Sequence, residues 1–140
     1  MALAGTLAVL VGSLMAAAPA SAAPLPDPVV VNASDAYIKS QCRFRASSVN
    51  LAAGTVRGRL TAKANWSSLA GFRDLTAVSV ECVLSDSSFS QVADVRKFVF
   101  AKSVYASKLV TVPASSEYHV CISASYSLRI FNGGRVYNCA

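Results

Sequence analysis

Four cysteines, widely spaced along 140 residues, constrain the fold of this chain more than any other feature. They are Cys42, Cys82, Cys121 and Cys139. No two of them lie two to four residues apart and the chain has one histidine, so the sequence lacks the close ligand pairs of a structural zinc site. An even number of cysteines in a small domain instead indicates two disulfides, which persist in exported proteins. We therefore expect an extracellular domain without a metal ion.

The first 22 residues have the pattern of a helical secretory signal peptide. An apolar run reaches Ala18 and is followed by Ala20-Ser21-Ala22, an Ala-x-Ala cleavage pattern. At about 16 residues the run is short for a membrane span. No basic residue precedes it, and a retained anchor is the alternative to cleavage after Ala22. We expect a secreted protein with no transmembrane segment after cleavage, a proline-rich lead-in over residues 23–28, and one domain over residues 29–140.

Beyond the leader, apolar and polar residues alternate with a period of two, the pattern of strands with one buried face. The clearest runs are 37–46, 55–65 and 75–84, and shorter or less regular ones are 29–31, 95–104, 109–112, 117–126 and 135–139. Gly58, inside the second run, is expected to mark a bulge or to leave room for an aromatic neighbour. Seven or eight short strands without a helical pattern predict an all-β fold, a single antiparallel β-sandwich with two disulfides.

The positions of the cysteines within these runs predict how they pair. Cys42 and Cys82 lie on the apolar faces of their strands, whereas Cys121 and Cys139 lie on the opposite, polar faces. Inward residues should pair with inward ones, which predicts Cys42–Cys82 in the core and Cys121–Cys139 on the surface. Closing loops of about 40 and 18 residues would contribute roughly 4 and 3 kcal/mol through loop entropy.

Charge gives the first pointer toward function. The chain carries a net charge of +6, and every charged residue follows the leader. Six cations share the polar faces of the first two long runs: Lys39, Arg43, Arg45, Arg57, Arg59 and Lys63. A basic surface favours anionic partners, and solubility alone is the alternative explanation.

A hairpin between these two runs would bring the cations together. One register places like charges directly opposite one another: Arg45 with Arg57, Arg43 with Arg59, and Lys39 with Lys63. Because such opposition destabilises a sheet, it indicates an anionic partner or acidic side chains from a neighbouring strand, such as Glu81. A register shifted by two residues would keep the basic face and relieve the opposition. A solvated face with splayed side chains is the other alternative.

Two further groups are candidates for recognition. His119, Arg135 and Tyr137 share the face of the outer disulfide, and arginine with aromatic residues is a common recognition composition. Ordinary surface residues are the alternative. Trp66, at the start of the predicted loop 66–74, could stack on a sugar or belong to the core. Asn32 and Asn65 fit the N-glycosylation sequon, which matters only if the host glycosylates exported proteins.

Patterns of catalysis are weak. His119 is the only histidine, and the sequence has no G-x-S-x-G motif that would supply a serine nucleophile beside it. The carboxylates show no spacing typical of a glycosidase. Phosphate-binding loops, dinucleotide-binding loops and nucleic-acid motifs are absent from the sequence. We expect no cofactor and a secreted, non-enzymatic binding domain whose basic sheet face meets an anionic cell-surface polymer or a protein. The alternative is a secreted inhibitor or toxin-like effector acting through an exposed loop, 66–74 or 128–134. A hydrolase ranks last.

Overall fold

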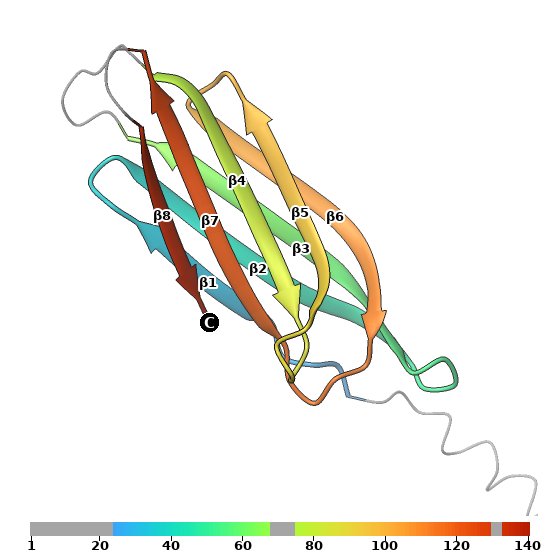
Figure 1. The fold of residues 1–140 in the computed structure, drawn as a ribbon. Coiled ribbons are helices and arrows are strands. Elements are labelled where there is room, and N and C mark those ends of the chain that lie inside the picture. Colours follow the sequence, from blue (N-terminus) through green and yellow to red (C-terminus); the bar gives the residue numbers. More distant parts are fainter. Residues whose placement is uncertain (1–23, 68–74, 130–132) are drawn as a thin grey trace, which may run out of the picture.

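The computed structural model describes residues 24–67, 75–129 and 133–140, which form two packed antiparallel sheets. The strands are β1 (Val29–Ser34), β2 (Ile38–Asn50), β3 (Thr55–Trp66), β4 (Leu75–Ser85), β5 (Gln91–Val99), β6 (Ser103–Pro113), β7 (His119–Leu128) and β8 (Gly134–Cys139). One sheet has the order β1-β2-β3-β6 and the other β5-β4-β7-β8 (Figure 1). The all-β, two-sheet expectation is confirmed, and the predicted signal peptide lies outside the described residues. The described residues contain no helix that is long and apolar enough to cross a bilayer.

One expected strand is wrong. The run 95–104 is divided by a turn, because β5 ends at Val99 and β6 begins at Ser103. Phe98 and Phe100, which made this run look like a core strand, are 56% and 83% exposed and pack edge-to-face against each other. Apolar content therefore gave a misleading signal at this turn.

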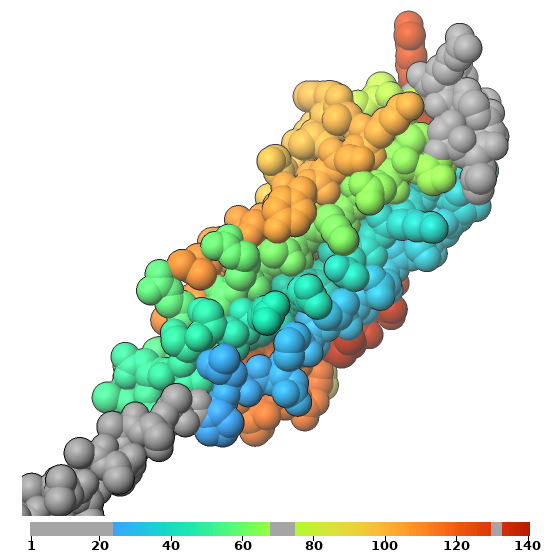
Figure 2. Space-filling model, turned by 180° about the vertical axis from the view of Figure 1, so that it is seen from behind, coloured from blue at the N-terminus to red at the C-terminus, as the bar shows by residue number. Residues whose placement is uncertain are grey.

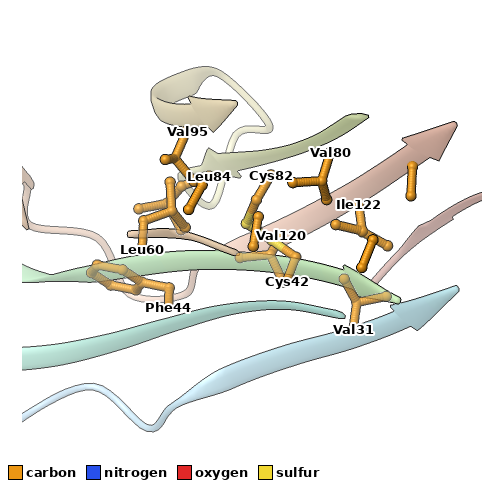
Figure 3. Packing of buried hydrophobic residues seen from close by; sticks show 14 of the residues in the cluster. Val31, Cys42, Phe44, Leu60, Val80, Cys82, Leu84, Val95, Val120 and Ile122 are labelled. Carbon is orange, nitrogen blue, oxygen red and sulfur yellow. A yellow bond between two sulfur atoms is a disulfide. The ribbon is translucent and has the colours of Figure 1, made fainter. Parts of the chain in front are cut away.

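The inward faces of both sheets build the core, which is crossed by the first disulfide. Cys42 of β2 and Cys82 of β4 are fully buried, with their Cα atoms 5.4 Å apart. Apolar side chains from both sheets surround the bond (Figure 3). The predicted inward pair is confirmed, and it joins the two layers covalently.

The second disulfide lies on the outward side of the other sheet. Cys121 of β7 is directly opposite Cys139 of β8, and their Cα atoms are 4.1 Å apart. Ala140 continues the pairing through two backbone hydrogen bonds with Val120. This bond is also as predicted, and it fastens the last strand to β7.

Gly58 provides both features that its position suggested. A Cβ atom there would lie 2.8 Å from Cε1 of Phe44 and 2.6 Å from the carbonyl oxygen of Arg45. A β-bulge in β2 follows directly, between Ala46 and Ser48. The missing side chain thus lets the Phe44 ring pack between the sheets, where it meets Tyr118 edge-to-face with ring centroids 5.3 Å apart.

The two open sides of the sandwich are protected differently. On one side β1 and β8 lie next to each other (Figure 1), and Asn138 Nδ2 donates to the carbonyl oxygen of Asn32 at 2.8 Å. On the other side, the edge strands β5 and β6 carry exposed Lys97 and Lys108 at positions paired with buried residues of the neighbouring strands. Lysines placed this way discourage a further strand from adding to a sheet edge.

Candidate functional site

The structure places all six predicted cations on the outward side of one sheet, and we call this surface the basic face. It is formed by β1, β2, β3 and β6 and carries Lys39, Arg43, Arg45, Arg57, Arg59 and Lys63, all exposed. Figure 2 views this face, with β1 in blue and β6 in orange at its two sides. None of these four strands contains an aspartate or glutamate, whereas β4 and β5 of the other sheet carry Glu81 and Asp94.

The register between β2 and β3 is the alternative one, shifted by two residues from the register that opposes like charges. Most cations face neutral polar residues: Lys39 opposes Asn65, Lys63 opposes Gln41, Arg43 opposes Thr61, and Arg57 opposes Ser48. Only Arg45 faces another cation, Arg59. Two features set this register: the hairpin loop at 51–54 and the bulge between Ala46 and Ser48, which places one extra residue in β2.

Two surface depressions adjoin on the basic face. The first has a volume of about 240 Å³ and is lined by Arg43, Arg45, Arg59 and Lys63 together with Gln41, Thr61 and Tyr105. The second, of about 530 Å³, shares Arg45 and Arg59 with the first and is bordered by Leu25 and Leu109. The centre of the face is therefore a shallow, cation-lined trough with apolar groups at one end.

The cations of the basic face have few partners within the protein. Arg59 Nη1 donates to Ser107 Oγ at 2.7 Å, and the other five make no side-chain hydrogen bond or ion pair with any described residue. Neutralisation by Glu81, one of the two alternatives, is wrong, because β4 belongs to the opposite sheet. Glu81 instead pairs with Arg96, whose Nη2 lies 3.2 Å from Glu81 Oε2. The positive charge of this face is thus not balanced from within the described protein.

Tyr105 is a residue of this site that sequence reasoning missed. It lies on β6 directly opposite Lys63, and it is 58% exposed. The signal in the sequence was the alternation of Val104 and Ala106, which the structure buries, with polar neighbours. This alternation would have extended the expected strand 109–112 back to residue 103, where β6 begins. The irregular run ending at residue 104 concealed that alternation.

The second predicted patch is spread along the outward side of β7 and β8, around the outer disulfide. Arg135 lies beside Tyr137, with its Cζ atom 5.9 Å from the ring centroid, and its Nε donates to Ser123 Oγ at 2.8 Å. His119 lies on the other side of the outer disulfide, six residues along β7 from the partner of Arg135 and four from the partner of Tyr137, which correspond to about 20 and 14 Å. The Tyr137 hydroxyl lies 3.0 Å from Cys139 Sγ, so the disulfide stands between His119 and the Arg135–Tyr137 pair.

His119 has local partners of a structural kind. Its Nε2 lies 3.2 Å from Oε1 of Glu117, and its ring stacks on Phe89 with centroids 4.3 Å apart. No hydroxyl or thiol group among the described residues hydrogen-bonds to this ring. Within the described residues, no group of three or more histidine, cysteine or acidic side chains is placed to hold a metal ion.

Trp66 belongs to the core rather than to a surface platform. It is 6% exposed, stacks on Tyr37 at 5.7 Å and lies 4.7 Å from the ring centroid of Tyr126. Most of the loop 66–74 and the centre of the loop 128–134 lie outside the described residues. Asn32 and Asn65 are exposed on the basic face, where Asn32 Oδ1 accepts a hydrogen bond from Gln41 Nε2.

Comparison with known proteins gives no family. No family profile and no curated protein matches this chain. A crystal structure of a protein described as a β-galactosidase from Bacteroides fragilis is similar over 69% of this chain, with 8% identity and a TM-score of 0.44. The match covers 15% of that much longer protein, so the resemblance is partial and distant and carries no argument about activity.

Proposed function

We propose that this protein is a secreted, non-enzymatic binding domain whose basic face holds an anionic polymer outside the cell. One observation carries the proposal: six exposed cations share a sheet face whose four strands contain no carboxylate. The leader pattern and two disulfides support an extracellular location.

The physical basis is the sum of many weak contacts. An ion pair at an exposed site contributes at most about 1 kcal/mol, so a single contact would not hold a partner. A row of cations meeting a row of anions adds these contributions, and salt screens them over about 10 Å at 0.1 M. Binding should therefore be strong at low ionic strength and fall steeply as salt rises.

A matched pair of variants tests the proposal. Arg43→Ser with Arg59→Ser removes two cations from the basic face, whereas Lys97→Ser with Lys102→Ser removes two from elsewhere and causes the same change in net charge. On an immobilised polyanion we expect the first variant to elute at clearly lower salt than the second, and both variants should still unfold cooperatively on heating. Equal elution of the two variants would show that net charge alone governs retention, which would refute the proposal.

A further inference from the structure

The cations of β2 and β3 follow a regular order. If each pair of directly opposed, outward-facing residues is regarded as a rung, five successive rungs carry Lys39, Lys63, Arg43, the pair Arg45 and Arg59, and Arg57. We call this set the cation row. Each of these five rungs bears a cation, and the first three alternate between the two strands.

The spacing of the cation row fits a linear polyanion. Residues two apart on one face of a strand are separated by about 6.8 Å, so neighbouring rungs repeat at about that distance. The row extends from the rung of Asn65 to that of Arg57, eight residues along β3, which corresponds to about 27 Å. A compact anion would meet one or two rungs, whereas an extended chain of anionic units could meet all of them.

The neutral partners indicate a chain that also carries hydroxyl groups. Asn65, Gln41 and Thr61 share rungs with Lys39, Lys63 and Arg43, and each offers hydrogen-bonding groups beside a cation. Beside Lys63, the exposed ring of Tyr105 lines the same depression as Gln41 and Thr61. An aromatic ring presents an apolar surface with a polar tip, which suits the apolar face of a sugar ring and its hydroxyl groups.

Single-stranded nucleic acid fits this face less well. Proteins that bind such strands stack successive bases on several aromatic side chains along a basic groove. Among the described residues of the four strands, Tyr105 is the only aromatic side chain on the outward side. One exposed aromatic side chain beside the cations can pack against one sugar ring, whereas the stacking of successive bases would need several aromatic side chains.

We infer that the basic face binds an extended acidic polysaccharide lying along β2 and β3. Its anionic groups meet the cation row, its hydroxyl groups bond to the neutral rung partners, and one sugar ring packs against Tyr105. This inference rests on the proposed function and adds the ligand class, its direction and the residue that distinguishes sugar from other polyanions.

The test compares two polyanions of equal charge, heparin-derived oligosaccharides of defined length and linear polyphosphate, with titration calorimetry at fixed low salt. We expect Tyr105→Ala to weaken oligosaccharide binding about tenfold and to leave polyphosphate binding unchanged. Tyr105→Phe keeps the ring and lacks only the hydroxyl group, so it should weaken oligosaccharide binding much less than Tyr105→Ala. Tyr137→Ala, which removes another exposed tyrosine from the opposite sheet, is the matched control and should have no effect. Affinity should rise with oligosaccharide length and level off near the length of the cation row.

The outcomes separate the inference from the proposed function. If Tyr105→Ala affects both polyanions equally, or neither, or if length has no influence, the polysaccharide assignment fails while polyanion binding stands. Tighter binding of a single-stranded oligonucleotide of equal charge would also overturn the assignment. If the unaltered protein binds none of these polyanions at low salt, both proposals fail.

Discussion

Arg45 lies directly opposite Arg59 on neighbouring antiparallel strands, and both side chains are exposed. Arg59 is engaged on its other side, where Nη1 donates to Ser107 Oγ of β6. Directly opposed like charges destabilise a sheet by a fraction of a kcal/mol, so this pair is a local cost to folding. A ligand that neutralises both residues would offset that cost. A substitution that removes the repulsion should therefore raise the stability of the unbound protein.

Arg45→Glu should stabilise the free protein and weaken polyanion binding. The change replaces a repulsive cross-strand pair by an attractive one, and we expect a gain of about 0.2–1 kcal/mol at low salt. Urea denaturation at low and high salt measures the gain, which screening should reduce. Arg45→Gln is the control that removes repulsion without adding attraction. A low-salt stability of Arg45→Glu below that of Arg45→Gln would contradict the electrostatic argument.

The two disulfides should differ in their contribution to stability. Replacing Cys42 and Cys82 by alanine opens a loop with a sequence separation of 40, and replacing Cys121 and Cys139 opens one of 18. Loop entropy predicts losses of about 4 and 3 kcal/mol, and the first pair also leaves a cavity between the sheets. Chemical denaturation of the two double variants measures the difference. A larger loss from the outer pair would contradict this ranking.

Gly58→Ala should destabilise the protein by about 1–3 kcal/mol through overpacking. The added Cβ would meet the backbone oxygen of Arg45 at 2.6 Å and the Phe44 ring at 2.8 Å, and the backbone contact cannot be relieved by a rotamer change. Gly54→Asn is the comparison, because Gly54 has open space around it and a φ of 65° that asparagine tolerates. Thermal unfolding should show a large decrease for the first variant and a small one for the second.

The turn before β5 should lose stability in acid. The Asp86 carboxylate accepts a hydrogen bond from the Ser88 hydroxyl and others from the backbone amides of Ser88 and Ser90, and these bonds hold its pKa below the usual 3.8. A carboxyl group with a lowered pKa stabilises the fold above its unfolded-state pKa and loses that effect as the pH falls through its folded-state pKa.

Denaturation between pH 2 and 5 checks this effect against Asp86→Asn. The stability difference between the unaltered protein and the variant should be largest near pH 5 and shrink toward pH 2. NMR titration of the Asp86 carboxyl group gives the pKa directly. A midpoint at or above 3.8 would rule out the hydrogen-bonded turn as the cause.

Much of the fold could be predicted because strands with one buried face alternate apolar and polar residues along the sequence. The facing of Cys42 and Cys82 was sufficient to predict their bond, since a buried cysteine can pair only with another that reaches the same core. The outward position of Cys121 gave the second bond in the same way. These predictions depended on the local period of the strands and not on how the strands are arranged.

What the sequence could not give was mostly non-local. Alternation does not say which sheet a strand joins, so Glu81 could not be assigned to the sheet opposite the basic face. The register of β2 with β3 depends on the hairpin loop and on the bulge next to Ala46; Gly58 indicated a bulge, but not which strand would carry the extra residue. His119, Arg135 and Tyr137 share one side of a sheet, but alternation does not show that the outer disulfide lies between His119 and the other two.

The buried disulfide has a mechanical consequence for the basic face. Arg43, Arg45, Arg57, Arg59 and Lys63 all lie between Cys42 and Cys82 in the sequence. Tension applied between the two ends of the domain would pass through the bond from Cys42 to Cys82 and bypass the chain between them. The chain under tension could lengthen elsewhere, while this part of the basic face would carry no force until a covalent bond broke.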